Sequence, residues 1–346
     1  MVETICQLFI EKTESYQKDD LMLYKSEGRY ASVSTEEFGQ KVRHFALGLK
    51  TLGFNAGNKL IILSENRPEW VMTDIATLCL GGVTVPIYTT LSPEQIKYIV
   101  NDSDSKILVC SNEELWEKVR VIKNELSLVS QFITFLSDPP EGVKSFDEVV
   151  ELGRGTASED LNSFERIALS VKPFDLASII YTSGTTGEPK GVMLTHDNFI
   201  SNVLSVSSII PLSHKDTTLS FLPLSHSYER TVTFALLYHG CTIGYVESME
   251  TIAENMLEVR PTVVPTVPRM LEKIYARVMD NVLSSSDVKR KIFFWALKTG
   301  KTYASKSLEN KPISGILRFK RSLAHKLVFS KIVEKTGGRI RFFVSA

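Results

Sequence analysis

Short apolar runs alternate with amphipathic stretches along the first 140 residues. The predicted strands are residues 59–63, 83–87, 106–110 and 131–136. The segments predicted as helices are residues 35–52, 66–80, a helix that starts at 92–95, and 113–123. The strands are continuously apolar, which is typical of a parallel sheet covered on both faces. The pattern therefore predicts a doubly wound α/β lobe.

Local signals define several helix ends. Ser34 and Glu37 are spaced as a capping box, and apolar residues recur every three or four positions until Gly53. Pro68 suits a first helical turn, and the Gly81–Gly82 pair suits a helix end. We therefore expect one buried face on the helix at residues 35–52.

The alternation continues in the second half of the chain. The predicted strands are residues 179–181, 192–194, 218–222, 242–246 and 262–265. The predicted helices are residues 195–209, 252–259 and a helix from Pro268, while residues 145–176 are expected to hold a short helix and a polar approach. We expect one incomplete domain, residues 1–346, with two doubly wound α/β lobes near 50–170 and 177–346.

Between the strands at 179–181 and 192–194 lies a loop rich in hydroxyls and glycine. Its candidate phosphate-binding residues are Thr182, Ser183, Gly184, Thr185, Thr186, Gly187 and Lys190. Glycines let backbone N–H groups approach an anion, and a lysine adds a positive charge suited to phosphate. A Walker A loop is excluded because Glu188 and Pro189 separate Gly187 from the lysine. An ordinary Gly/Thr surface turn is the alternative, which the length of the whole run disfavours.

Composition limits the classes of function. The chain has 346 residues, 43% of them hydrophobic, with 40 basic and 40 acidic residues, so the zero net charge argues against nucleic-acid binding. Its four cysteines are scattered and predict neither disulfides nor a zinc site. No basic leader precedes an apolar core, and no run of about 18 apolar residues occurs. We expect a cytoplasmic protein that acts on small molecules.

Residues 179–191 resemble the signature loop of the adenylate-forming enzymes, which include acyl-CoA synthetases, firefly luciferase and peptide-synthetase adenylation domains. Residues 63–70, 222–230 and 261–275 resemble the long-chain fatty-acid CoA ligases in particular. The resemblance implies the large N-terminal domain of that superfamily. It also implies ATP-dependent activation of a long-chain fatty acid to acyl-AMP, followed by transfer to CoA, with AMP and diphosphate released.

The resemblance also suggests roles for single residues. Residues 182–190 would hold the β- and γ-phosphates of ATP, with Thr182 as a Mg²⁺ ligand and Lys190 as an electrostatic clamp. His226 would lie near the carboxylate and the α-phosphate. The alternative for His226 is a histidine that starts a helix and bonds to backbone.

Other polar residues have no such support. His196 is expected to be structural and His44 to lie at the surface, while Glu229 and Arg230 could form a local ion pair. Val264, Val267 and Met270 are candidates for lining an acyl tunnel, although apolar residues at these spacings are more often ordinary core.

Residues 289–331 form a basic segment with twelve Lys or Arg against the single acid Glu309. Apolar residues intervene, so the pattern predicts basic amphipathic helices. A solvated face on structural helices is the plain interpretation. The alternatives are peripheral contact with anionic membrane or a landing zone for the phosphates of CoA.

The sequence ends before the regions in which the family carries its adenine, ribose and catalytic-lysine sites. We therefore expect a truncated chain without the C-terminal domain, whose activity alone is in question. Three hypotheses compete: a long-chain fatty-acid CoA ligase, an adenylating ligase for another acid or acceptor, and a non-catalytic nucleotide-binding module. The first accounts best for the basic segment and for residues 222–230.

Overall fold

The computed structural model describes residues 2–182 and 188–345, with the backbone alone for 157–162. The chain divides into two compact units. Unit 1 comprises residues 1–216 with 220–247, and unit 2 comprises residues 217–219 with 248–346. This division differs from the predicted lobes at 50–170 and 177–346, because residues 177–216 and 220–247 belong to unit 1. The lobe boundaries stay a prediction.

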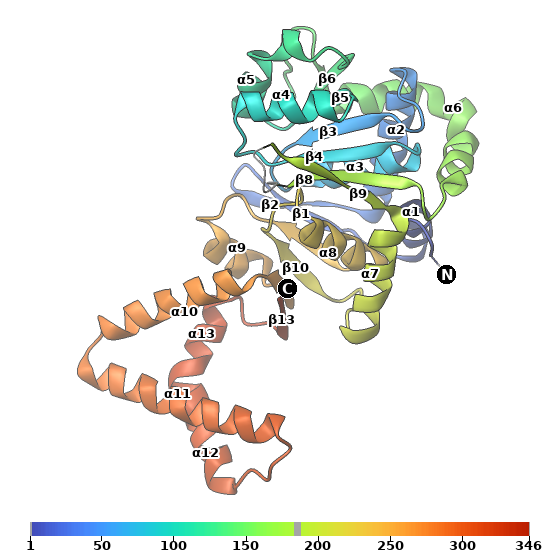
Figure 1. Ribbon diagram of the computed structural model, residues 1–346. Coiled ribbons are helices and arrows are strands. Elements are labelled where there is room, and N and C mark those ends of the chain that lie inside the picture. Colours follow the sequence, from blue (N-terminus) through green and yellow to red (C-terminus); the bar gives the residue numbers. More distant parts are fainter. Residues whose placement is uncertain (1, 183–187, 346) are drawn as a thin grey trace. The chain divides into compact units, whose positions relative to one another are not determined.

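Helices and strands alternate through unit 1 (Figure 1). In chain order they are α1 (Ile5–Ser15), β1 (Met22–Ser26), β2 (Arg29–Val33), α2 (Thr35–Thr51), β3 (Lys59–Leu63), α3 (Pro68–Cys79), β4 (Val83–Ile87), α4 (Pro93–Asp102), β5 (Ser105–Cys110), α5 (Glu113–Arg120), η1 (Lys123–Glu125), β6 (Gln131–Thr134), β7 (Lys144–Ser145), α6 (Phe146–Ser170), β8 (Leu176–Thr182), β9 (Lys190–Thr195), α7 (His196–Ile209), α8 (Ser227–Tyr238) and β11 (Thr242–Tyr245). Strand β10 (Thr217–Ser220) lies where the chain passes between the units.

Within the described residues, the main sheet of unit 1 has seven strands in the order β7-β6-β5-β3-β4-β8-β9. All neighbours are parallel except β8 and β9, which pair antiparallel at the sheet edge. In a smaller sheet, β1 pairs parallel with β11 and antiparallel with β2. The predicted α/β fold with a doubly wound sheet is confirmed for this unit.

Alternation along the central strands creates two hydrophobic cores. In β3, Leu60 and Ile62 face the core shared with α2, α3 and α6, whereas Ile61 and Leu63 face the core shared with α4 and α5. Figure 1 shows these two groups of helices on opposite sides of the sheet. Successive side chains of a strand point to opposite faces of the sheet, and here both faces are covered by helices. Every residue of a central strand can therefore be apolar, which explains the continuous apolar runs.

Helix α6 corrects a prediction. A short helix was expected within residues 145–176, but α6 has 25 residues and packs along α2. Gly153 has no room for a side chain, because an added Cβ would lie 1.8 Å from the carbonyl oxygen of His44. A Cβ at Gly48 on α2 would lie 2.0 Å from the carbonyl oxygen of Val149 on α6. These glycines lower helix propensity but allow close helix packing, and the packing stabilises the helix.

Unit 2 consists mainly of helices. Its elements are α9 (Ile252–Val259), β12 (Val263–Thr266), α10 (Pro268–Leu283), α11 (Asp287–Leu308), α12 (Gly315–Ala324), the π-helical turn η2 (His325–Phe329), α13 (Ser330–Lys335) and β13 (Phe342–Ser345). Strands β12 and β13 pair in parallel, with Val263 opposite Phe342. In the part of the chain that the structure describes, no helix combines the length and apolar character needed to cross a membrane.

Candidate active site

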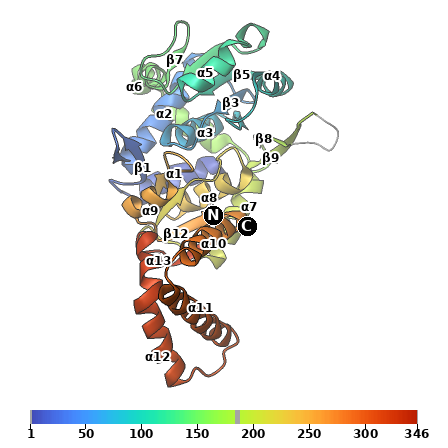
Figure 2. The ribbon, with the colours of Figure 1, turned by 90° about the vertical axis from the view of Figure 1, so that its left-hand side faces the viewer.

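The predicted phosphate loop is flanked by a β-hairpin. Thr182 ends β8 and Lys190 begins β9, and these two residues are register partners in the antiparallel pair. Both are exposed. Figure 2 shows β8 and β9 running together as this hairpin. The predicted site residues Ser183, Gly184, Thr185, Thr186 and Gly187 lie outside the described residues. The structure therefore places the two end residues of the loop opposite each other on neighbouring strands.

Close packing holds the base of the hairpin. A Cβ at Gly191 would lie 2.6 Å from Cγ2 of Ile179 and 3.2 Å from the ring of Tyr181, so a side chain there would push the strands apart. The Tyr181 hydroxyl donates a hydrogen bond to the carboxylate of Asp102 on α4. Burial, and then the hydrogen bond to Asp102, raise the pKa of Tyr181 above its ordinary value, so the phenol stays a donor. The first strand is therefore fixed to the body of unit 1.

His226 is the N-cap of α8. Its ring Nδ1 accepts a hydrogen bond from the backbone N–H of Tyr228 at 3.2 Å, and the side chain is exposed. The alternative interpretation, a histidine bonded to backbone at a helix start, is therefore correct for Nδ1. A neutral imidazole that accepts at Nδ1 carries its proton on Nε2. The cap leaves His226 with an Nε2–H donor that is suited to an anionic oxygen.

Asn66 holds the segment that leads to His226, a contact that sequence reasoning missed. Its side-chain amide donates to Ser220 Oγ at 2.9 Å and to the Leu222 carbonyl at 2.7 Å, and accepts from the Leu224 N–H at 3.0 Å. The signal was present, because residues 63–70 and 222–230 were singled out together. Asn66 and Ser220 are 154 residues apart in the chain, and the sequence gave no reason to pair the two segments.

Arg230 corrects a second prediction, since its partner is Asp74 and not Glu229. The Arg230 guanidinium forms a bidentate ion pair with the Asp74 carboxylate, and both side chains are completely buried. It also donates to Ser178 Oγ at 2.5 Å, and Ser178 in turn donates to the Thr84 carbonyl at 2.8 Å. The ion pair thus joins α8 to α3, and the hydrogen bond to Ser178 joins α8 to β8. It links the helix that begins with His226 to the strand that ends at Thr182.

Glu229 is buried, and it forms no ion pair within the part of the chain that the structure describes. Its Oε1 accepts from Ser220 Oγ at 2.5 Å, whereas Oε2 has no hydrogen-bond partner among the described residues. Burial raises the pKa of Glu229 to about 8, and the Ser220 hydrogen bond only partly opposes that shift. Glu229 is therefore mostly protonated at neutral pH, and it supports the Asn66–Ser220 contact as a neutral group.

The other histidines differ in burial. His196 is completely buried, its Nδ1 accepts from the Ile5 N–H at 3.4 Å, and burial lowers its pKa to about 4. It is a neutral structural residue, as predicted. His44 was expected at the surface, but it is half-buried where α6 crosses α2, and burial lowers its pKa.

The predicted acyl-tunnel residues lie in unit 2. Val264 is buried in β12, while Val267 and Met270 are half-buried at the start of α10. The Met270 N–H donates to the Val267 carbonyl at 2.9 Å, which closes the first turn of the helix. These contacts are equally compatible with an ordinary core, so the tunnel stays a prediction.

Among the described residues, no group of three or more His, Cys, Asp or Glu side chains is arranged to hold a metal ion. The exposed Thr182 hydroxyl suits Mg²⁺, which accepts hard oxygen ligands and usually keeps phosphate and water in its coordination shell. The chemistry of the Thr182 hydroxyl is therefore compatible with a Mg²⁺ ligand.

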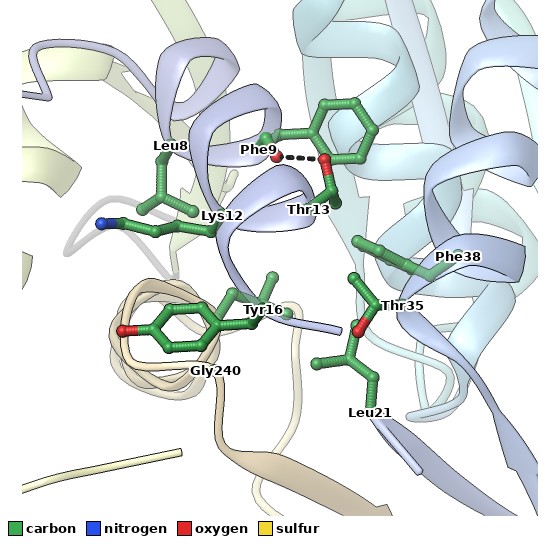
Figure 3. A pocket seen from close by; sticks show the side chains of 10 residues that line it. Leu8, Phe9, Lys12, Thr13, Tyr16, Leu21, Thr35, Phe38 and Gly240 are labelled. Carbon is green, nitrogen blue, oxygen red and sulfur yellow. Dashed lines mark hydrogen bonds between the residues drawn. The ribbon is translucent and has the colours of Figure 1, made fainter. Parts of the chain in front are cut away.

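An apolar crevice in unit 1 lies apart from these residues. It is lined by residues of α1 and its surroundings, among them Phe9, Tyr16, Leu21 and Phe38 (Figure 3). Gly240 borders it with a positive φ of 65°, and a Cβ there would lie 2.5 Å from the Tyr16 ring. None of the predicted site residues that the structure describes lines the crevice. It is a packing gap between α1 and its neighbours.

Comparisons with known proteins identify the family of the chain. The family model described as AMP-binding enzyme matches residues 10–320. A long-chain-fatty-acid CoA ligase of Mycobacterium bovis is 30% identical over 330 residues, covering 94% of this chain and 54% of the relative. A peroxisomal long chain acyl-CoA synthetase of Arabidopsis thaliana is 33% identical over 326 residues, covering 92% and 44%.

A solved structure shares the fold. The adenylation domain of a carboxylate reductase from Mycobacterium chelonae has a TM-score of 0.68 at 19% identity, covering 99% of this chain and 53% of that one. The chain spans about half the length of the curated relatives that it matches.

Proposed function

Because the chain belongs to the family of AMP-binding enzymes, we propose that it is the N-terminal part of a long-chain fatty-acid CoA ligase. The complete protein would activate a fatty acid with ATP and transfer the acyl group to CoA. The observation that carries the proposal is the β8–β9 hairpin, in which Thr182 and Lys190 are register partners at the two ends of the signature loop. The names of the relatives supply the substrate class.

The first step forms a mixed anhydride. A carboxylate oxygen attacks the α-phosphorus of ATP, a P–O bond to the β-phosphate breaks, and diphosphate leaves with its electron pair. Lys190 would neutralise the charge that accumulates on the leaving phosphates, because an ammonium close to phosphate stabilises that anion. When bound at Thr182, Mg²⁺ would supply further neutralisation of the phosphate oxygens. The loop residues 183–187 would provide backbone N–H donors.

His226 would orient the reacting groups. Its Nδ1 is held by the Tyr228 N–H, so its Nε2–H can donate to a carboxylate or α-phosphate oxygen. The buried Arg230 supports this role because it joins the helix of His226 to α3 and to strand β8. In the second step the thiolate of CoA attacks the acyl carbonyl, and AMP leaves with the oxygen that joined it to the acyl group.

The remaining parts of the proposal are broader. Val264, Val267 and Met270 would line the path of the acyl chain, and bulky substitution at Val267 should then alter chain-length preference in the complete enzyme. We propose a cytoplasmic enzyme that contacts anionic membrane peripherally through residues 289–331. The excess of basic residues there supports this contact.

ATP–pyrophosphate exchange with a panel of carboxylic acids tests the function. The complete gene product should exchange label with long-chain fatty acids in preference to short or aromatic acids, and Lys190→Ala should slow exchange or weaken ATP binding. Lys172→Ala is the matched control, because Lys172 is also exposed and lies outside the loop. Preference for another acid would select the second hypothesis, and no exchange with any acid would favour a non-catalytic module. The same assay on this chain shows whether it acts alone.

A further inference from the structure

Helix α12 carries an apolar face that nothing covers among the described residues. Ile316 and Phe319 are each 71% exposed, and Leu323 is 39% exposed. Their spacing of three and then four residues places them in one row on an α-helix. Two large side chains left so open on adjacent turns are unusual for a surface that only meets water.

The exposure is not the result of a loosely attached helix. Helix α12 contacts α11, and on a different face from the open row Ala324 is buried and Leu317 is half-buried. The Arg321 guanidinium lies 4.3 Å from the Tyr303 ring centroid on α11. Just beyond α12, the Phe329 ring lies against Gly300, where an added Cβ would be 3.0 Å from it. Figure 2 shows α11 and α12 side by side. The helix is therefore held by one face while the Ile316–Phe319–Leu323 row stays open.

Positive charge accompanies the open row. Lys320 lies between Phe319 and Leu323, and Lys326 follows in the next turn; both are exposed. Neither forms an ion pair with a carboxylate in the described ranges, 2–182 and 188–345. Helix α11 adds exposed Lys291, Lys298 and Lys301 at steps of seven and three residues, so they also lie along one side of that helix.

We propose that α12 is a membrane-docking helix, whose Ile316–Phe319–Leu323 row enters the headgroup region of an anionic bilayer while Lys320 and Lys326 bind lipid phosphates. The proposal refines the membrane contact proposed above and rests on it, but it does not require catalysis. An amphipathic helix that lies in the interface combines an apolar row with lysines whose long side chains reach the headgroups. Charge complementarity selects an anionic lipid surface over an uncharged partner.

Vesicle co-sedimentation with this chain, without ATP or acid, tests the proposal. Binding is expected to vesicles of mixed phosphatidylcholine and phosphatidylserine, and much less to phosphatidylcholine alone. Raising salt from about 0.05 M to about 0.5 M should weaken binding, because it shortens the Debye length. Since nucleotide and substrate are absent, failure here would leave pyrophosphate exchange untouched, and the two proposals can fail separately. Equal binding to neutral vesicles would overturn the docking role.

Paired variants identify the face. Replacing Ile316 and Phe319 by Ser should weaken partitioning about tenfold or more, because two apolar side chains would no longer be buried in lipid. The matched control replaces Leu283 and Val288 by Ser. These two residues are 52% and 67% exposed and lie outside the basic segment. The control should change partitioning less than about twofold. Similar losses in both variants would contradict the assignment to α12.

Two double charge-reversal variants separate electrostatic attraction to lipid from the burial of apolar side chains. Lys320→Glu with Lys326→Glu should clearly reduce both the preference for anionic vesicles and the salt dependence, whereas Lys172→Glu with Lys215→Glu in unit 1, which makes the same charge change elsewhere, should reduce them less. All these positions are exposed, so circular dichroism and melting should be unchanged.

Two other occupants of the row would give different results. If the complete gene product failed to bind while this chain bound, the row would belong to a contact with the rest of the protein, and the proposal would be wrong. A concentration-dependent dimer that Phe319→Ser removed, without vesicle binding, would assign the row to a second copy and would also overturn it.

Discussion

Replacing Glu229 by Gln should reduce the pH dependence of stability. The carboxyl is completely buried, its Oε1 accepts from Ser220, and its Oε2 has no partner among the described residues. Arg230, the adjacent cation in the sequence, is bound to Asp74, so the nearest guanidinium does not offset the charge. Burial raises the pKa from 4.5 to about 8. The glutamine side chain has the same shape, keeps an oxygen acceptor for Ser220, and cannot ionise.

The sign and size of the effect follow from the two pKa values. A pKa that is raised on folding means that the folded state holds the proton more tightly than the unfolded chain. The resulting stabilisation is complete below about pH 4.5, declines as pH rises, and is lost once pH passes about 8. Between about pH 5.5 and pH 8.5 the unaltered chain should therefore lose about 3 kcal/mol of unfolding free energy relative to the Glu229→Gln variant.

Urea unfolding measures this difference. Trp70 and Trp116 are both buried in unit 1 and report its unfolding by fluorescence. The free energy of unfolding would be measured across this pH range for the unaltered chain, Glu229→Gln and the exposed control Glu11→Gln. Glu11→Gln should follow the unaltered chain at every pH. Parallel curves for all three proteins would show that Glu229 does not titrate on unfolding, and would refute the reasoning from burial.

Three further outcomes are expected. Arg230→Met should cost about 3–5 kcal/mol of unfolding free energy, because it leaves the Asp74 charge buried alone. Adding Asp74→Leu should recover most of that loss in urea unfolding, and a double variant without recovery would contradict this explanation. Gly191→Ala should destabilise unit 1 by about 1–3 kcal/mol in thermal melting, since its Cβ would overlap Ile179; an unchanged melting temperature would refute the close contact. His226→Asn should retain the α8 cap, whereas His226→Ala should lose about 1 kcal/mol of unfolding free energy. Both variants should slow pyrophosphate exchange in the complete enzyme, and full exchange by His226→Asn would argue against a role for the imidazole.

The local sequence was sufficient for most elements. Helix starts with a suitable side chain were predictable, as at Thr195, whose hydroxyl accepts from the Asn198 N–H at 3.3 Å. The apolar runs predicted β3, β4 and β5 because each is buried on both faces. Such signals depend on residues within about one turn or one strand of each other, and they are visible without knowledge of distant contacts.

The site was predictable only in part. The unusual run of hydroxyls and glycines predicted a phosphate loop, and phosphate binding there stays a prediction. The two described ends of the run, Thr182 and Lys190, are register partners in the structure. The support behind it was not predictable. Asn66 and Ser220 lie far apart in the chain, as do Asp74 and Arg230, and neither pair has a local pattern that selects one partner over another.

What the sequence by itself determined was the order of strands and helices along the chain, their apolar faces and the residue types available in one loop. The tertiary structure decided which distant residues meet: the length of α6, through the contact of Gly48 and Gly153 with their opposing helices, and the pairing of Arg230 with Asp74 instead of Glu229. The physical reason is that secondary structure follows from neighbouring residues, whereas a buried charge or a glycine contact gains its energy from a partner that only folding brings close.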